Sequence, residues 1–336
     1  MGTLVPPKWG KSLSKSKHSA FFQSSLRRQF DRGRMRNNEI NARQKLLRQA
    51  ILIAISLANE SKEFGELVLK GACAAELLYG DFRFSQDIDY SHPDSIANPK
   101  KCKENFTEFL QDTLGERGYK ILRLKWNVKP EGKFQQEAPF FWRGHQIQVD
   151  VISMEEWEKI IKLPSSLKEK DRRFLDPQNY LRYRIDISEH EYTKGHEQKI
   201  LEGYTIKVYT SAMIVAEKLR AICQQIPEYP QRFHKKPKPR ARDFYDIYQI
   251  MQRANIHWNK SQNSEILQPM FKAKEVELES LARIKNKETK TLHSNPSELT
   301  RLKDTVTGQL REFDFYYDYV VNLAEEILGN IHSTCH

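Results

Sequence analysis

Two aspartates separated by a single isoleucine, Asp87 and Asp89, are the feature that most constrains how this 336-residue chain can fold. They are preceded by a short apolar run ending at Gly71 and by an Ala- and Leu-rich segment that closes at Gly80. This order predicts a strand over 64–70, a glycine turn, a short helix over 73–79 and a strand over 83–90. Because side chains alternate along a strand, both carboxylates project from one face and Ile88 from the other.

A third candidate carboxylate, Asp150, lies in a later segment. The stretch 120–152 is typical of a β-meander, with strands expected over 121–126, 134–142 and 146–151 and turns at 130–132 and 143–145. In the last of these strands Ile147, Val149 and Val151 face one way and Asp150 the other. We therefore expect Asp150 to join Asp87 and Asp89 from a neighbouring strand of the same sheet.

Three carboxylates of this kind predict a metal site. Carboxylate oxygens are the ligands that Mg²⁺ or Mn²⁺ prefers, and two such ions can stabilise the attacking and leaving oxygens of a nucleotidyl transfer. The turn at Gly71 would let the backbone approach a triphosphate, and the N-terminus of the helix that follows favours anions.

The rest of the chain predicts the domain organisation. We expect helices over 41–58, 105–119 and 211–226 and another starting near Asp243, and beyond about residue 163 only one short strand, at 204–209. A basic loop over 232–242 contains Pro237 and Pro239 and cannot be helical throughout. The predicted class is α/β (α+β): a basic arm over 1–40, a core with a small mixed sheet over 41–163 and a mostly helical C-terminal domain over 164–336.

Two groups of motifs resemble those of a known family. The sequences Lys70-Gly71, Tyr79-Gly80 and Arg83-Phe-Ser-Gln-Asp-Ile-Asp89 resemble the motif of polymerase-β-like nucleotidyltransferases, in particular the AbiEii/AbiGii toxins. In the second half, Ala216-Glu-Lys-Leu219 and Ala241-Arg-Asp-Phe-Tyr-Asp246 resemble two further motifs of these toxins. The resemblance spans roughly Ile51 to Met251.

The resemblance implies a role for each matched residue. Metal binding would fall to Asp87 and Asp89, with Asp150 as the third carboxylate, and Asp243 would orient Lys218 or a substrate group. The residues implied at the nucleotide are Gly71, Cys73, Arg83, Ser85, Lys218 and Arg242. The implied reaction transfers a nucleoside monophosphate from an NTP to an acceptor, by a toxin that acts in phage defence and is restrained by an antitoxin.

One departure from the family keeps other functions open. The family has Gly-Gly-Thr or Gly-Gly-Ser where this chain has Gly71-Ala72-Cys73, so a thiol, a weaker donor, replaces a hydroxyl. The alternatives are a binding module for nucleic acid or antitoxin with impaired catalysis, and an enzyme that modifies a small molecule such as an antibiotic.

Each remaining site residue also has a purely structural interpretation. Lys218 could pack its stem along the border of its helix, and Asp243 could complement a helix dipole. Asp150 could face solvent, and the basic loop could be a solvated surface loop.

The positive charge of the chain is concentrated in its first 48 residues. They hold twelve Lys or Arg against Asp31 and Glu39, which gives +10 of the formal total of +11. Such an arm attracts a phosphate backbone, so an RNA end, such as that of tRNA, is the preferred acceptor. The alternatives are a solvated tail and a transit peptide, and Pro6, Pro7 and Gly10 disfavour the latter by interrupting an amphipathic helix.

Cysteine usage and hydropathy predict a cytoplasmic protein. The four cysteines have neither paired metal spacing nor the density of a secreted disulfide framework. No run of eighteen apolar residues occurs, so we expect no membrane span. The terminal segment His332-Ser-Thr-Cys-His336 could bind a metal but is more typical of a frayed end.

Overall fold

The computed structural model describes residues 42–60, 64–80, 82–83, 85, 87–132, 138–162, 180–233, 235–259, 261–306 and 309–334. The chain divides into a first unit of residues 1–48 and a second of residues 49–336. In the first unit residues 42–48 are helical, and the predicted basic arm over 1–40 lies outside the described residues. The second unit holds the sheet, the remaining helices and the candidate site.

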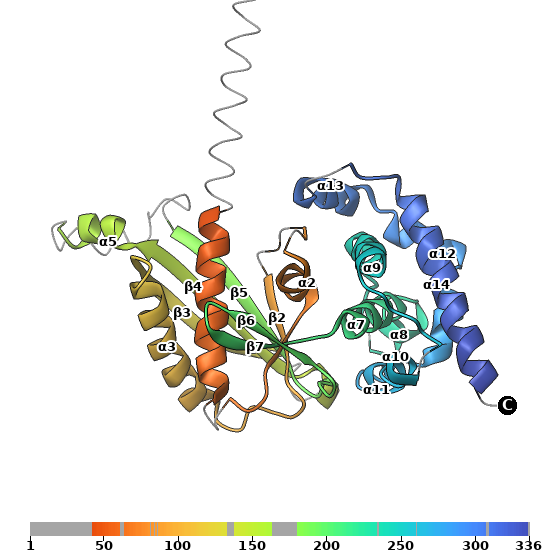
Figure 1. Ribbon diagram of the computed structural model, residues 1–336, viewed down its shortest axis with the longest axis horizontal. Helices are drawn as coiled ribbons and strands as arrows, with labels where there is room; N and C mark the ends of the chain where they lie inside the picture. Colours follow the sequence, from red (N-terminus) through yellow and green to blue (C-terminus); the bar gives the residue numbers. More distant parts are fainter. Residues whose placement is uncertain are drawn as a thin grey trace, which may run out of the picture. The chain divides into compact units, whose positions relative to one another are not determined.

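A seven-stranded mixed sheet forms the first part of the second unit (Figure 1). Its strands are β1 (Val68–Lys70), β2 (Asp87–Ser91), β3 (Tyr119–Lys129), β4 (Gly144–Ser153), β5 (Tyr180–Ser188), β6 (Glu197–Leu201) and β7 (Tyr204–Val208). Their order is β3-β4-β5-β2-β1-β7-β6, in which β2 and β5, and β1 and β7, are parallel neighbours. The other neighbours are antiparallel.

The helices fall into two groups. Residues 49–60 are helical, and with α2 (Gly71–Tyr79), α3 (Pro99–Gly115), η1 (Phe140–Trp142) and α5 (Met154–Ile161) they belong to the part that contains the sheet, called here the sheet half. Residues from 211 onward form the helical half, whose helices are α7 (Ser211–Cys223), α8 (Glu228–Arg232), α9 (Ala241–Arg253), α10 (Ser261–Ser264), α11 (Leu267–Lys272), η2 (Leu278–Arg283), α12 (Lys287–His293), α13 (Pro296–Thr305) and α14 (Phe313–Thr334). The short helix α2 packs against both α7 and α9 (Figure 1). None of the described helices has the length and apolar character needed to cross a membrane.

The sheet has one apolar and one polar face. On the apolar face the register aligns a row of side chains from four strands: Trp126, Ile147, Ile185 and Ile88. The three isoleucines of this row are at most 1% exposed. The opposite face carries Asp87 and Asp89, as predicted from the alternation.

Several predicted elements are confirmed. The strand with Asp87 and Asp89, the helix before it and the later strands β3, β4 and β7 occur where the sequence predicts them, with shifted ends. Gly80 caps α2 with a φ of 79°, and its N–H donates to the Glu76 carbonyl at 2.8 Å. The helix predicted over 105–119 instead begins at Pro99, where the Asn98 side chain accepts a hydrogen bond from the Lys101 N–H.

The strand predicted over 134–142 is wrong where it can be checked. Residues 140–142 form a 3₁₀ helix, and 133–137 lie outside the described residues. The predicted turn over 143–145 is wrong as well, because Gly144 opens β4. A β-carbon at Gly144 would lie 2.1 Å from the Ile187 carbonyl oxygen, so this glycine permits a close approach of two strands.

The second correction concerns the chain beyond residue 163. It supplies β5 and β6 as well as β7, so the sheet extends past the expected boundary and the helical half begins only at Ser211. The alternation of buried Tyr183, Ile185 and Ile187 with polar residues was the available signal for β5.

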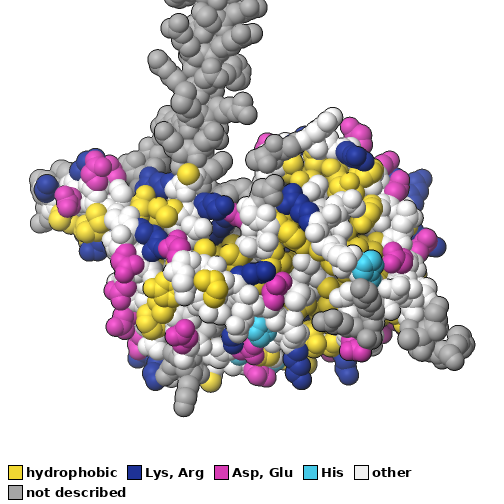
Figure 2. All heavy atoms as spheres, viewed as in Figure 1, with side chains coloured by type: hydrophobic (Ala, Val, Ile, Leu, Met, Phe, Trp, Pro, Cys, Tyr) yellow, Lys and Arg dark blue, Asp and Glu magenta, His cyan; other side chains and the backbone are white. Residues whose placement is uncertain are grey.

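Cysteines and charges agree with the sequence analysis where they are described. Cys73, Cys102 and Cys223 are buried and form no disulfide, while Cys335 and the side chains of the terminal cluster lie outside the described residues. Acidic and basic side chains are interspersed over the face of the molecule in Figure 2 rather than gathered in one patch.

Candidate active site

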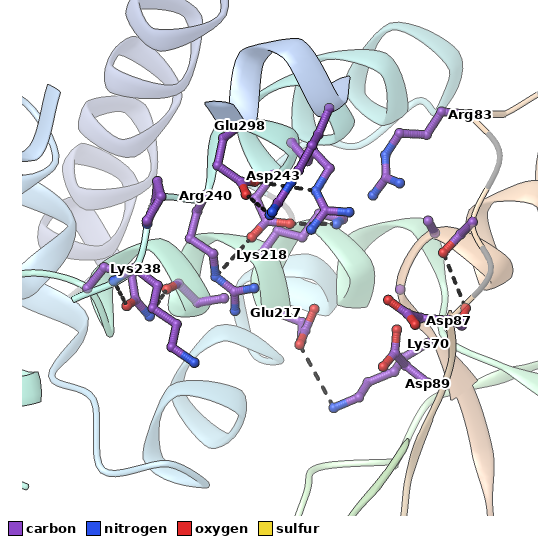
Figure 3. A pocket seen from close by; sticks show the side chains of 18 of the residues that line it. Lys70, Arg83, Asp87, Asp89, Glu217, Lys218, Lys238, Arg240, Asp243 and Glu298 are labelled. Atoms are coloured by element: carbon purple, nitrogen blue, oxygen red, sulfur yellow. Dashed lines mark hydrogen bonds and ion pairs between the residues drawn. The ribbon is translucent and has the colours of Figure 1, made fainter. Parts of the chain in front are cut away.

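A cavity of about 770 Å³ opens between the polar face of the sheet and helices α7, α9 and α13. In Figure 3 Asp87 and Asp89 lie on one side of it, Arg240 and Lys238 on the other, and Glu217 between them. All residues predicted for the site except Asp150 and Cys73 line this cavity: Gly71, Arg83, Ser85, Asp87, Asp89, Lys218, Arg242 and Asp243. Segments far apart in the sequence therefore converge on the aspartate pair.

The strand register explains which groups meet at Asp89. Asp89 pairs with Lys70 of β1 on one side and with Asp186 of β5 on the other, and Asp186 pairs with Gln146 of β4. Directly paired residues point to the same face, with neighbouring strands about 4.8 Å apart. Asp87 belongs to the adjacent row and pairs with Arg184.

The close approach at Gly71 requires a glycine. Gly71 has a φ of 70°, and a β-carbon added to it would lie 2.9 Å from Oδ2 of Asp89. The backbone at the start of α2 is therefore directly against the carboxylate. This contact gives a physical reason for the Lys-Gly step of the motif.

Asp89 lies among other carboxylates and beside one lysine. Burial raises its pKa to about 6, and the charges of Glu217, Asp186 and Asp87 add to the effect while Lys70 opposes it. The Arg184 guanidinium lies between two of these groups: Nη2 donates to Oδ1 of Asp87 at 2.8 Å, and Nε lies 3.0 Å from Oδ2 of Asp186. A divalent cation would favour the ionised form of Asp89.

The donor chemistry of this face fits Mg²⁺ or Mn²⁺. Within the described residues, no three His, Cys, Asp or Glu side chains converge closely enough to hold an ion by themselves. Mg²⁺ commonly takes one or two protein carboxylates and completes its shell with water and substrate phosphates. Asp87 and Asp89 on one strand face meet that requirement.

Asp150 does not reach the pair. It lies on the same face of the sheet, but on β4. Strand β5 lies between β4 and β2, which are therefore about 10 Å apart. Asp150 is also one row beyond the row of Asp87 and Arg184. It is fully buried between Arg123 and Arg182, whose Nε atoms donate to it at 2.8 and 2.7 Å. Burial opposes its ionisation, but the hydrogen bonds from Arg182 and Arg123 outweigh burial and lower its pKa. Asp150 is thus on the predicted face of the sheet, but its predicted proximity to Asp87 and Asp89 is wrong.

Lys218 and Asp243 meet, as the motifs imply. Lys218 Nζ donates to Oδ1 of Asp243 at 2.9 Å and lies 2.8 Å from Oδ2 of Asp246. Arg83 binds Asp246 through two hydrogen bonds of 2.6 and 2.7 Å. Burial opposes ionisation of Asp243, but Lys218 and Arg240 hold its pKa well below the usual range. This ionic chain, defined by Arg83, Asp246, Lys218 and Asp243, links the loop before β2 to α7 and α9.

A second buried ionic cluster lies behind Lys70. Lys70 Nζ donates to Glu191 and to the Ser188 hydroxyl, both at 3.2 Å. Glu191 also accepts from Arg220 of α7 and lies 3.3 Å from Lys274 Nζ. Burial opposes ionisation of Glu191, but Arg220, Lys70 and Lys274 hold its pKa well below the usual range. Lys70 is thereby fixed beside Asp89 and tied to the helical half.

The Cys73 thiol lies outside the cavity. It is 3% exposed, in the buried part of α2, while Gly71 and Ala72 line the cavity. The replacement of a hydroxyl by a thiol therefore removes no group that projects into this cavity.

Sequence reasoning missed several lining or adjacent residues. They are Lys70, Arg184, Asp186, Ser188, Glu217 and Arg301. Lys70 and Glu217 could have been predicted from the sequence, because both lie inside the matched motifs. Asp186 and Arg184 were missed because β5 was not recognised.

A mixed sheet with an Asp-x-Asp pair behind a glycine turn, together with a helical half that completes the cavity, defines a nucleotidyltransferase. Residues 53–319 match the model of the family described as nucleotidyl transferase AbiEii toxin, type IV toxin–antitoxin system, and the chain belongs to that family. No curated protein matches it significantly.

Solved structures with similarity to the chain include two from Helicobacter pylori. JHP933 is 16% identical with a TM-score of 0.49, and the match covers 88% of this chain and 97% of that one. A candidate nucleotidyltransferase from the same organism is 16% identical with a TM-score of 0.45, covering 89% and 99%. An antigenic nucleotidyltransferase-like protein from Paracoccidioides brasiliensis is 14% identical with a TM-score of 0.33, covering 76% and 92%.

Proposed function

We propose that this nucleotidyltransferase toxin depends on Mg²⁺ or Mn²⁺ and transfers a nucleoside monophosphate from an NTP to the end of an RNA in the cytoplasm. The observation that carries the proposal is the pair Asp87 and Asp89, with Asp186 in register beside Asp89, at a cavity whose opposite wall is cationic. In the reaction an acceptor hydroxyl bonds to the α-phosphorus, and the bond to pyrophosphate breaks.

Asp87 and Asp89 would hold the metal, and Asp186 rather than Asp150 would be the carboxylate next to them. A bound divalent cation would supply stabilisation of the charge that develops on the phosphoryl oxygens. Asp186 is suited because its register places it next to Asp89. The Arg184 guanidinium, which lies between Asp87 and Asp186, would contact a phosphate of the nucleotide.

The triphosphate would lie between the Gly71 turn and the wall of α9 and α13. Gly71 and Ala72 present the N-terminus of α2 to the cavity, which favours an anion. Across the cavity, Arg242 and Arg301 flank Glu298, at 3.7 and 2.8 Å from its carboxylate. Lys218 and Arg83 are each paired with buried carboxylates, so their charges would orient the site more than attract the nucleotide.

The acceptor is inferred from charge and from the family. The cavity lining carries eight Lys or Arg and five Asp or Glu, a formal balance of +3. The basic arm over 1–40 adds a sequence-independent attraction for a phosphate backbone. Membership of a type IV toxin–antitoxin family supports an antitoxin as a further partner.

Labelling with each of the four NTPs tests the proposal. Purified protein with Mg²⁺ and α-labelled NTP is expected to label total RNA, and Asp87→Ala is expected to abolish the labelling. A control, Asp112→Ala, changes an exposed carboxylate on α3 outside the cavity and should leave activity intact. Label on protein or on a small molecule, with RNA unlabelled, would exclude the RNA acceptor.

The same variant distinguishes the proposed enzyme from a binding module with impaired catalysis. That alternative requires NTP binding without turnover, and toxicity that Asp87→Ala does not change. The feature that favours it is the altered turn Gly71-Ala72-Cys73, and the position of the Cys73 thiol outside the cavity weakens the part of this support that rests on the thiol.

A further inference from the structure

Residues 235–240, which precede α9, lead from the wall of the cavity to the surface. Residues 235–240 form neither helix nor strand, and Pro237 and Pro239 restrict the backbone. Hydrogen bonds hold three backbone N–H groups of this segment. The N–H of Lys235 donates to the Pro230 carbonyl at 2.8 Å, that of Lys238 to Oε1 of Gln225 at 2.8 Å, and that of Arg240 to Nδ1 of His293 at 3.0 Å.

The cavity itself points toward this loop. Glu217, Ala221 and Gln225 follow one another at four-residue spacing on α7 and the turn after it, and all three line the cavity. At a rise of 1.5 Å per residue they form a floor about 12 Å long that starts near the carboxylates. Lys238 stands at its far end, opposite Asp87 and Asp89 in Figure 3.

The lysines of the loop differ from the arginines next to it. Arg240 and Arg242 lie 3.4 and 3.7 Å from the carboxylates of Asp243 and Glu298. Lys236 and Lys238 are exposed, and no described carboxylate lies within ion-pair distance of either. Uncompensated ammonium groups at the mouth of a cavity attract phosphate.

An aromatic pair lies at the outer end of the loop. The rings of Trp142, from η1, and Phe233, after α8, have centroids 4.4 Å apart, and Lys235 Nζ lies 3.0 Å from the Trp142 centroid. Both rings are partly exposed, and neighbouring Phe140 is 55% exposed. Three backbone steps, at most about 10 Å of chain, separate Lys235 from Lys238.

We propose that Lys238, Lys236 and the Trp142–Phe233 pair form an acceptor track for a single-stranded RNA end. Phosphates lie along the two lysines, a base stacks on the exposed part of the ring pair, and the terminal hydroxyl reaches Asp87 and Asp89 over the floor of α7. Base stacking on aromatic rings beside a basic groove is how proteins bind single strands without reading sequence. The inference rests on the proposed RNA acceptor and assigns it a path.

The test measures binding of a fluorescein-labelled single-stranded oligoribonucleotide to the full chain by anisotropy, without NTP. The double variant Lys236→Glu, Lys238→Glu is expected to weaken binding at least about tenfold. It should also reduce, by about two, the slope of the logarithm of the binding constant against the logarithm of the salt concentration. The control, Lys100→Glu with Lys103→Glu, makes the same charge change on exposed positions of α3 and should leave binding close to wild type.

Trp142→Leu tests the ring pair, since it keeps an apolar side chain but removes the aromatic face. We expect at least about fivefold weaker binding, with Trp142→Phe restoring most of it. A packing role alone predicts equal binding by Trp142→Leu and wild type. Equal binding in that variant or in the lysine double variant overturns the track, as does absence of oligonucleotide binding by wild type.

These outcomes are independent of catalysis. If the variants lose binding as expected while wild type labels no acceptor with NTP, the track stands and the proposed function fails. If RNA is labelled by wild type and both variants at equal acceptor KM, the function stands and the track fails.

Discussion

At the residue scale, Gly71 is the position where backbone conformation and chemistry coincide. Gly71→Ala would combine a positive φ with a β-carbon 2.9 Å from the Asp89 carboxylate. We expect transfer activity to fall at least about tenfold and stability to fall by about 1–3 kcal/mol. Gly80→Ala is the matched control, because its φ is 79° but no atom lies within 4 Å of the added carbon. It should lose stability and keep activity, and an equal loss of activity in both variants would contradict the contact with Asp89.

Asp89 also makes stability depend on pH. Its pKa of about 6 exceeds the usual value near 3.9, so the folded state binds the proton more tightly than the unfolded state. The stability that this tighter proton binding contributes is fully present below about pH 4 and is lost as the pH rises through about 6. In the absence of divalent ions, the free energy of unfolding of Asp89→Asn should therefore rise relative to that of wild type by up to about 3 kcal/mol between pH 4 and pH 7. Urea unfolding across this range measures the difference, and a gap that does not change with pH would refute the assignment.

At the element scale, the proposed metal site depends on β5, because this strand carries Asp186. Asp186→Asn should reduce transfer by at least about a hundredfold with little loss of stability, because Asp186 sits in register with Asp89. Asp150→Asn should mainly destabilise the protein, because it leaves Arg123 and Arg182 without their shared acceptor. Transfer rates and unfolding midpoints of the two variants check this, and the reverse pattern would restore Asp150 to the site.

The elements also show what can be read from the sequence. The segment from β1 to β2 was predictable because its glycines, its helix and its aspartates lie within 25 residues and obey local rules. The row that joins Lys70, Asp89 and Asp186 was not, since register depends on pairing between strands far apart in the chain. Asp150 was misplaced for the same reason: alternation gives the face of a side chain but not its neighbours.

The ionic chain between β2 and α9 can be tested as an element of structure. Asp246 is fully buried and binds both Arg83 and Lys218. Asp246→Asn would therefore leave a buried cation without a full negative charge beside it. We expect a loss of about 3–5 kcal/mol in unfolding free energy. Asp304→Asn, at an exposed position of α13, should change it by less than about 0.5 kcal/mol. A comparably small effect for both would show that Asp246 does not hold the halves together.

At the scale of the whole molecule, the cavity is completed by both halves of the second unit. The chain Arg83–Asp246–Lys218 joins them on one side, and the cluster around Glu191 joins β1 and the segment after β5 to α7 and Lys274 on the other. Both connections are buried, so the carboxylates and the cationic wall are held opposite each other before substrate arrives. Such preorganisation favours stabilisation of charge that develops during the reaction.

We propose that this cavity performs metal-dependent nucleotidyl transfer. The most direct measurement is the rate of pyrophosphate release from NTP in the presence of RNA, for wild type with Mg²⁺, wild type with excess EDTA, and Asp89→Asn with Mg²⁺. We expect release and RNA labelling in equal amounts for the first, and at least a hundredfold less for the other two. Release that persists in EDTA, or that Asp89→Asn leaves unchanged, would contradict it.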